Sequence, residues 1–298
     1  MKFLPNSCVC GEREAEIAFP VADWNFSNVT ETGVMRRCIA CASLFPDRFP
    51  DGNFIGLAYR TYYTVPTRKS IAGQVRRATL EMLQGRMTTR HLPASARRIL
   101  DFGCGSGAWL ARMKDLRPDL ELAGTDITRP DLPSLPFRWI DPADLPAEGQ
   151  SFDWITLSHV LEHVPDPLDT LRALVRCLAP GGSIWIATPN AQSYLFASLK
   201  GRARDADFPR HRQIFSRSAL LQLCQACGLE CRFEMPPRIN AMLNLGTGLA
   251  ARARPPIDIM PPVGALGPIA ATASYLLQPY RRRLANAPEH ILIANCKP

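Results

Sequence analysis

A chain of 298 residues, 46% of them hydrophobic, is long enough to bury one large α/β core with a small appendage beside it. The opening MKFLPNSCVC lacks the apolar run of a signal peptide, so we expect a cytoplasmic protein whose ten cysteines are reduced thiols or metal ligands. A secreted, disulfide-stapled scaffold is therefore not expected, and the net charge of +8 leaves an anionic partner as a candidate.

Residues 1–55 show few periodic stretches and are expected to form a small irregular segment. CVCG and CIAC resemble the half-sites of a zinc knuckle, and four thiolates around one zinc ion would explain how such a segment holds a fold. The first pair departs from the usual spacing, because Ser7 stands where a C-x-x-C partner of Cys10 would be. The predicted metal ligands are Cys8, Cys10, Cys38 and Cys41, with a degenerate, metal-free remnant as the alternative.

Basic residues are concentrated between Arg60 and Arg98, where nine lysines or arginines are accompanied by a single acid, Glu81. Within this stretch the periodicity predicts one amphipathic helix over residues 67–87. The charges either form a solvated helix face or attract an anionic substrate or surface.

From residue 98 onward, short apolar stretches alternate with helical ones, which is typical of a parallel sheet with helices on both faces. The strand candidates are RIL, LELAGT, FRWI, FDWITLS, SIWIATP, CRFEM and HILIANC. The helical stretches include DPLDTLRALVRCL and FSRSALLQLCQACGLE, the second of which ends at Gly228. We interpret Cys224, Cys227 and Cys231, in or just after that helix, as small packing residues.

Residues 259–280 form an uncharged run long enough to span a bilayer, but its four prolines and two glycines argue against a spanning helix. We expect a loop with a short helix that packs over the site. Peripheral membrane contact through residues 259–283, aided by Arg281, Arg282 and Arg283, is the alternative.

The stretch ILDFGCGSG places an acid, Asp101, directly before three glycines and a helical stretch. Glycines let the backbone of such a loop approach a nucleotide at the carboxyl edge of the sheet. GCGSGA also fits a dinucleotide fingerprint, but Asp101 would repel an anionic pyrophosphate. S-adenosylmethionine instead brings an ammonium group and a sulfonium, so Asp101 favours that ligand.

A second acid agrees with this choice. In the stretch LELAGTDI, the strand ends with Asp126, 25 residues beyond Asp101, where a carboxylate can accept hydrogen bonds from both ribose hydroxyls of a nucleotide. Either aspartate alone could simply cap a helix or a turn, but the two together at this spacing favour a nucleotide site.

Together these motifs resemble a class I S-adenosylmethionine-dependent methyltransferase, in the branch that modifies quinones, sugars and lipids. The resemblance runs from about residue 97 to 234 and resumes in the final strand; its most specific part is SFDWITLSHVLEHVPDPLDTLRALVRCLAPGGSIWIATPN. It implies a Rossmann-like sheet of seven strands with helices on both faces and an antiparallel last strand. Related methyltransferases sometimes begin with a C-x-x-C…C-x-x-C module, and in similar enzymes a segment like that of Tyr59, Tyr62 and Tyr63 covers the cofactor.

The resemblance also assigns residues to the cofactor. It implies that Asp101, Gly103 and Gly105 surround the methionine end, that Asp126 binds the ribose, and that Ile127 lies against adenine. Asp141 would meet the adenine amino group, and Ser158 and His159 would line the cleft. The residue after the adenine acid usually offers a backbone N–H, but here it is Pro142, which has none. Either the register shifts toward Ala143 and Asp144, or that hydrogen bond is lost.

Methyl transfer requires the nucleophile, the methyl carbon and the sulfur to be in line, and a hydroxyl acceptor also benefits from a base. HVLEHVPDP places Glu162 and His163 just beyond the strand FDWITLS, where the acceptor is expected. We predict His163 as the general base and Glu162 as its orienting partner, with His211 as a second candidate base. A histidine that only hydrogen-bonds the loop backbone is the alternative.

The sequence therefore predicts five regions: a cysteine-containing segment (1–55), a basic lid region (56–95), the cofactor-binding core (96–238), an apolar acceptor-side insertion (239–286) and a final core strand (287–298). The predicted function is O-methylation of a small-molecule, sugar or lipid-linked acceptor, which the basic stretch would attract if it is anionic. The rivals are an NAD-dependent oxidoreductase that uses the same loop and a non-catalytic binding module. No Asn-Pro-Pro-Tyr-type motif or RNA module is found, so a nucleic-acid partner is not expected.

Overall fold

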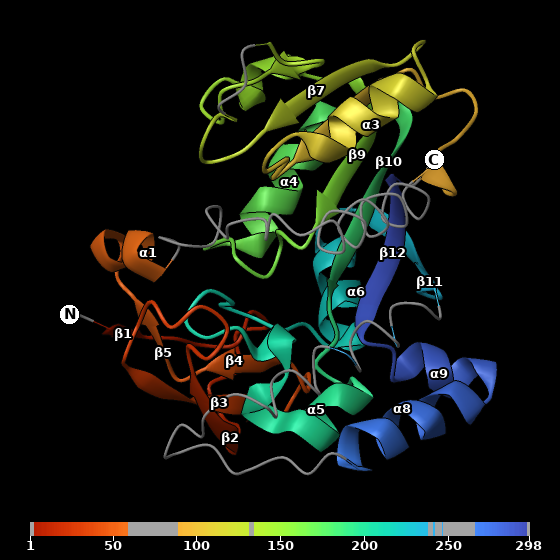
Figure 1. The fold of residues 1–298 in the computed structure, drawn as a ribbon. Coiled ribbons are helices and arrows are strands. Elements are labelled where there is room, and N and C mark those ends of the chain that lie inside the picture. The colour runs from red at the N-terminus through yellow and green to blue at the C-terminus, as the bar shows by residue number, and fades with distance from the viewer. Residues whose placement is uncertain are drawn as a thin grey trace, which may run out of the picture.

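The computed structural model describes residues 3–58, 89–130, 134–237, 241, 246 and 266–296 (Figure 1). The helix predicted over residues 67–87, the tyrosines at 59–63 and the first part of the apolar run, up to residue 265, lie outside these residues.

A seven-stranded sheet forms the centre of the molecule, in the spatial order β11-β12-β10-β9-β6-β7-β8. Its strands are β6 (Arg98–Phe102), β7 (Glu121–Thr125), β8 (Arg138–Trp139), β9 (Phe152–Ser158), β10 (Leu178–Pro189), β11 (Leu229–Glu234) and β12 (Glu289–Cys296). Five neighbouring strands run parallel to one another, namely β10, β9, β6, β7 and β8. Strand β12 is antiparallel to both of its neighbours, β10 and β11. Every predicted strand is found, and the antiparallel last strand is confirmed.

Helices cover both faces of this sheet. Ile99 and Leu100 are both fully buried although they are consecutive, because neighbouring side chains of a strand point to opposite faces. Ile99 belongs to the core that contains Leu110 and Met113 of α3 (Ala108–Leu116). Leu100 belongs to the opposite core, which contains residues of α4 (Pro167–Cys177) and α6 (Arg217–Ala226).

Local sequence signals fix the ends of α4 and α6. The Asp166 carboxylate accepts a hydrogen bond of 2.9 Å from the Asp169 N–H, and Pro167 occupies the first helical position. Ser216 Oγ accepts the Ala219 N–H at 3.1 Å, and after α6 the chain turns at Gly228 with a φ of +71°.

The N-terminal residues are more regular than the sequence suggested. Residues 3–58 form β1 (Phe3–Pro5), β2 (Ala15–Ala22), β3 (Thr32–Cys38), β4 (Leu44–Pro46), β5 (Arg48–Pro50) and α1 (Gly52–Ala58). Strands β2, β3 and β4 form an antiparallel sheet, and β1 pairs with β5. The expectation of an irregular segment is therefore wrong here. The register between β2 and β3 shifts between Ile17 and Phe19, which breaks the alternation that marks a strand in a sequence.

Residues 207–216, which we call the bridging segment, join these N-terminal strands to the central sheet. The N–H of Leu44 donates to Ile214 O at 2.9 Å, and the N–H of Ile214 donates to Leu44 O at 2.7 Å. Arg210 is fully buried, and its Nη2 lies 2.7 Å from both Asp23 Oδ1 and Asp207 Oδ1. The N-terminal strands and the central domain thus share buried polar contacts as well as apolar packing.

The remaining elements are short. They are η1 (Leu145–Glu148), α5 (Tyr194–Leu199), η2 (Lys200–Arg202), η3 (Arg204–Ala206), α8 (Leu266–Leu277) and α9 (Tyr280–Ala285). Tyr275 of α8 stacks on Tyr194 of α5, with the ring centroids 4.7 Å apart. Within the described ranges, no helix combines the length and the apolar character that crossing a bilayer requires.

Candidate active site

The loop between β6 and α3 is built from three glycines in the left-handed conformation. Gly103, Gly105 and Gly107 have φ values of +79°, +54° and +72°. A Cβ at Gly103 would stand 2.3 Å from Val160 Cγ2, so the turn after β9 lies directly against this loop. A Cβ at Gly105 would meet no atom within 4 Å. Gly105 therefore presents bare backbone to open space at the carboxyl edge of the sheet, where α/β folds bind nucleotides.

Asp101 lies beneath the loop, near the end of β6. Its carboxylate is buried, and Oδ1 accepts a hydrogen bond of 2.6 Å from Thr156 Oγ1 on the neighbouring strand β9. Burial raises the pKa of Asp101 to about 7. The hydrogen bond from Thr156 lowers this pKa but offsets the effect of burial only in part, and the negative charge of Asp126 raises it further. The site thus holds a carboxylate that a bound cation would stabilise in its ionised form.

Asp126 follows β7 and fixes the loop from the other side. Its Oδ2 accepts the Gly105 N–H at 2.7 Å, and its Oδ1 accepts the Ile127 N–H at 2.7 Å. Each carboxylate oxygen keeps a second lone pair that can accept a ligand hydroxyl. The adjacent Ile127 side chain is 92% exposed, which leaves a large apolar surface free beside the loop.

Asp141 is exposed and lies just after β8. Its Oδ1 accepts the Ala143 N–H at 3.0 Å, and its carbonyl accepts the Asp144 N–H at 2.9 Å. Because Pro142 has no N–H and that of Ala143 is already bonded to Asp141, a register shift toward Ala143 would not supply a free donor. The assignment of Asp141 to the adenine amino group stays a prediction.

The turn after β9 carries the predicted Ser158 and His159. Ser158 is exposed, and His159 adopts a φ of +56°. The His159 ring lies between two carboxylates, with Nδ1 3.3 Å from Glu162 Oε1 and Nε2 3.1 Å from Glu289 Oε2. Burial opposes its protonation, but Glu162 and Glu289 together raise the pKa of His159 to about 10. His159 is therefore a cation at neutral pH.

Glu162 is completely buried at the centre of three histidines. Its Oε2 accepts a hydrogen bond of 2.9 Å from Thr188 Oγ1 of β10. Burial favours the protonated form, but His159 above all, together with His163 and His211, lowers the pKa of Glu162 to about 2. Glu162 therefore carries a buried negative charge at neutral pH.

His163 and His211 pack edge to face, with their ring centroids 4.6 Å apart. A carbonyl oxygen can only accept, so His163 Nδ1 donates to Arg210 O at 3.1 Å and His211 Nδ1 donates to Asp205 O at 2.8 Å. In each neutral ring Nε2 then carries the lone pair. Burial lowers the pKa of His211 to about 4, which keeps this ring neutral. One ligand atom each from Glu162, His163 and His211 lies within 4.8 Å of the others, a donor set that could also hold a divalent metal ion.

Two groups of this cluster were missed by sequence reasoning. Glu289 reaches His159 from β12, and Thr188 reaches Glu162 from the end of β10. No motif spacing connects residues so far apart in the chain, and only the pairing of β12 with β10 brings Glu289 to the site.

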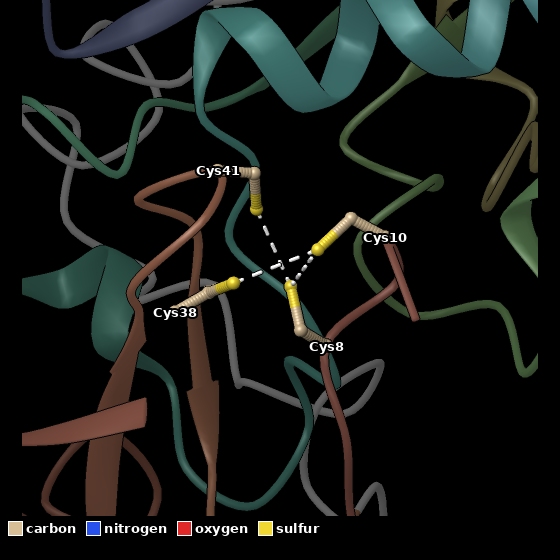
Figure 2. Close-up of side chains that lie close together, drawn as sticks. All are labelled: Cys8, Cys10, Cys38 and Cys41. Carbon is tan, nitrogen blue, oxygen red and sulfur yellow. Dashed lines mark hydrogen bonds between the residues drawn. The ribbon is translucent and has the colours of Figure 1, made fainter. Parts of the chain in front are cut away.

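The predicted metal ligands Cys8, Cys10, Cys38 and Cys41 are also brought together, but where the N-terminal strands meet α6 (Figure 2). A separate cavity of about 490 Å³ lies at the amino ends of the strands. Its lining includes Arg98, Glu121 and Phe152, the first residues of β6, β7 and β9. Because ligands of parallel sheets bind at the carboxyl ends of the strands, we do not assign this cavity to the active site.

Comparisons with known proteins agree with this geometry. A family model described as "Methyltransferase domain" matches residues 65–232. The Ubiquinone biosynthesis O-methyltransferase of Ralstonia nicotianae is 32% identical over 164 residues, which cover 46% of this chain and 68% of that protein. The protein of the same name from Chromobacterium violaceum is 34% identical over 122 residues, which cover 36% of this chain and 52% of that protein. Among solved structures, a SAM dependent methyltransferase from Archaeoglobus fulgidus is 19% identical, with a TM-score of 0.47, and the match covers 80% of this chain and 99% of that chain.

The matched residues 65–232 contain the glycine loop, both aspartates of the loop and, apart from Glu289, the cluster around Glu162. The match extends over more than half of the sequence, and the central sheet has the seven strands and the antiparallel last strand that the resemblance implied. The chain therefore belongs to the methyltransferase-domain family and is a class I S-adenosylmethionine-dependent methyltransferase.

Proposed function

We propose that this enzyme transfers the methyl group of S-adenosylmethionine to a hydroxyl oxygen of a small-molecule acceptor. The observation that carries the proposal is the buried carboxylate of Asp101 beside the bare backbone of Gly105, with Asp126 bonded to the same loop. The names of the similar ubiquinone biosynthesis O-methyltransferases support oxygen as the methyl acceptor.

The residues around the loop fit the parts of the cofactor. The carboxylate of Asp101 would pair with the ammonium group, and Asp126 would accept the ribose hydroxyls. The exposed Ile127 side chain would cover one face of adenine, and Asp141, Ser158 and Gly103 would complete the cleft. The bound cofactor supplies a methyl group that is activated by a positively charged sulfur. The protein then has to align the acceptor, exclude water and remove one proton.

His163 is the residue that we propose to remove this proton. The Arg210 carbonyl accepts a hydrogen bond from its Nδ1–H, which makes Nε2 the ring nitrogen that would take up the proton. The buried Glu162 carboxylate lies close to this ring, with an oxygen within 4.8 Å of a His163 nitrogen. His159 cannot take this part at neutral pH because it is already protonated between Glu162 and Glu289. We infer that His159 is a positioning residue that links β9 to β12.

The finer assignments remain part of this proposal. An anionic acceptor, a sugar or lipid-linked acceptor, a cytoplasmic location and peripheral membrane contact through residues 259–283 are predictions from the sequence. So are the five regions into which we divide the chain.

Incubation of the enzyme with a cell extract and cofactor carrying an isotope-labelled methyl group tests the function. We expect one labelled small molecule whose label is bound to oxygen, as mass fragmentation would show, and less product from Asp101→Asn at a cofactor concentration that just saturates the wild type. Calorimetric binding of NAD without binding of S-adenosylmethionine would contradict the proposal, as would a folded enzyme that binds the cofactor and labels only nitrogen or carbon.

Cofactor affinity is expected to depend on pH through Asp101. Its raised pKa of about 7 means that Asp101 must lose a proton to pair with the ammonium group. Affinity should therefore rise about tenfold between about pH 6 and about pH 8 and then level off. Asp101→Asn should weaken binding by about 10- to 100-fold at about pH 8 and remove this dependence. Titration calorimetry at three pH values measures both effects.

Thermal unfolding provides the control for that variant. The folded-state pKa of Asp101 lies above its unfolded value, so its proton stabilises the fold below about pH 4, and this stabilisation is lost as the pH rises to about 7. Asp101→Asn should therefore raise the midpoint of the ligand-free protein at about pH 8. If the unfolding midpoint of Asp101→Asn is instead lower than that of the wild type, its weaker cofactor binding results from damage to the fold.

Alanine at Gly103 and at Gly105 separates packing from ligand binding. Both glycines have positive φ, so either substitution costs about 1–2 kcal/mol of stability. Gly103→Ala also collides with Val160 and should lower the unfolding midpoint further. Gly105→Ala extends into open space and should weaken cofactor binding by about tenfold or more with little further loss of stability. Equal effects of the two variants on both measurements would contradict this assignment.

A further inference from the structure

Four cysteine side chains from two turns point toward a common centre (Figure 2). Cys8 Sγ lies 3.4 Å from both Cys41 Sγ and Cys10 Sγ, and Cys10 Sγ lies 3.5 Å from Cys38 Sγ. All four sulfurs lie within 4.8 Å of one another. A tetrahedral zinc ion with Zn–S bonds of about 2.3 Å separates its sulfurs by about 3.8 Å, which is close to this arrangement.

The backbone compensates for the unequal spacing of the two pairs. The Gly11 N–H donates to Cys8 O at 3.0 Å, and Gly11 has a φ of +84°. The Ala42 N–H likewise donates to Cys38 O at 3.0 Å, and Ala42 has a φ of +62°. Each pair therefore lies on a tight turn that ends in a left-handed residue. Because of these two turns, Cys8 and Cys10, which are separated by one residue, reach the same centre as Cys38 and Cys41, which are separated by two.

We propose that Cys8, Cys10, Cys38 and Cys41 bind one zinc ion as four thiolates. Three of the cysteines are buried, and the fourth, Cys10, is half-buried. Thiolate sulfur selects zinc among the common divalent ions, and a closed set of four such ligands is typical of a structural site. A surface depression of about 590 Å³ lined partly by Cys10 and Cys41 gives the ion a path to the cluster.

The zinc ion would fasten the N-terminal strands to the bridging segment. Next to Cys8, the Val9 N–H donates to Gln213 Oε1 at 3.4 Å, and Gln213 Nε2 donates to Ser7 O. On the other turn, Cys41 O accepts a hydrogen bond of 3.0 Å from Ser218 Oγ. The first turn thus holds the bridging segment, and the second holds the start of α6, which follows that segment directly.

The bridging segment also reaches the catalytic cluster. The Arg212 N–H donates to Glu162 O at 2.9 Å, and His211, its neighbour in the bridging segment, packs against His163. The zinc site would therefore position the acceptor side of the active site without contacting the reacting atoms.

Metal analysis of the full-length protein, purified under reducing conditions without added metal, tests the assignment. We expect about one zinc per chain, and after exchange with Co²⁺ we expect the visible and near-ultraviolet absorption of a tetrahedral thiolate site. Iron in place of zinc would overturn the proposal. So would a protein that contains no metal and takes up no Co²⁺, or one whose unfolded form shows only six reactive thiols because two disulfides have formed.

Variants locate the ion. Cys38→Ser and Cys41→Ser should each lose most of the zinc, whereas Cys227→Ser, which changes a half-buried cysteine outside the cluster, should retain it. Because the first two variants could misfold, the Co²⁺ spectrum of the wild type carries the assignment independently. Retention of stoichiometric zinc by Cys41→Ser would overturn it.

Hydrogen exchange tests the fastening role. Removal of zinc from the wild type by a chelator should speed amide exchange in peptides that contain Leu44 and Ile214, which bond to each other, while peptides from the central strand β9 exchange as before. Unchanged exchange at Leu44 and Ile214 would contradict this role. Neither measurement needs cofactor or acceptor, so failure here is distinct from failure of the proposed methyl transfer.

Discussion

His163→Ala is expected to lower kcat by about 10²- to 10⁴-fold, the range typical of a lost general base, while the affinity for S-adenosylmethionine stays unchanged. Affinity should be preserved because the residues proposed to hold the cofactor lie around the glycine loop, whereas the His163 ring bonds to Arg210 O and packs on His211. Steady-state kinetics with the acceptor that the labelling experiment identifies measure kcat, and calorimetry with the cofactor measures its affinity.

A pH profile distinguishes a base from a residue that only positions others. A general base contributes to the pH dependence of kcat, so His163→Ala should change the shape of the pH profile, whereas loss of a positioning residue should only lower it. His91→Ala provides the control, since the charged neighbours of His91 are Arg90, Arg232 and Glu234 and not the cluster around Glu162. A pH profile of His163→Ala with the same shape as that of the wild type would remove His163 as the base.

Arg210→Met is expected to destabilise the fold by about 3–5 kcal/mol, the range measured when one partner of a buried ion pair is removed. The substitution keeps much of the side-chain volume but leaves Asp23 and Asp207 buried without the guanidinium that neutralises them. Although burial favours the protonated acid, Arg210 lowers the pKa of Asp207 to about 2, and this stabilisation is lost as the pH falls toward that value. The urea midpoint of unfolding measures the loss.

Two further variants test whether the loss of stability comes from the buried charges. Arg138→Met removes an exposed ion pair with Glu148 and should cost no more than about 1 kcal/mol. Asp23→Asn and Asp207→Asn introduced together with Arg210→Met remove the stranded charges and should recover much of the stability. A loss below about 1 kcal/mol for Arg210→Met alone would show that the buried pair does not hold the N-terminal strands.

The parts of this protein that could be predicted from its sequence are those in which neighbours in space are neighbours in the chain. Asp101, Gly103 and Gly105 lie within five residues, and the strand and helix that flank them have simple apolar periodicity. Long apolar runs such as FDWITLS also identify strands that are buried on both faces. The strands of the central sheet were predicted for this reason.

The rest depends on pairing between distant residues. Glu289 meets His159 only because β12 pairs with β10, and Arg210 meets Asp23 across a distance of 187 positions in the chain. The strands β1, β4 and β5 escaped prediction because each has only three residues, and β2 escaped it because a register shift interrupts its alternation. In the N-terminal pair, the single residue between Cys8 and Cys10 argued against a symmetrical cluster until the turn at Gly11 was known.

The position of β12 in the sheet has a consequence for biosynthesis. This strand, residues 289–296, is inserted between β10 and β11, which are made long before it. While the ribosome is still adding residues 235–288, β10 and β11 each expose an unpaired edge, a state that invites association with other chains. The nascent protein can complete its sheet, and supply Glu289 to His159, only after this late strand has emerged, so we expect chaperone dependence to be greatest during that interval.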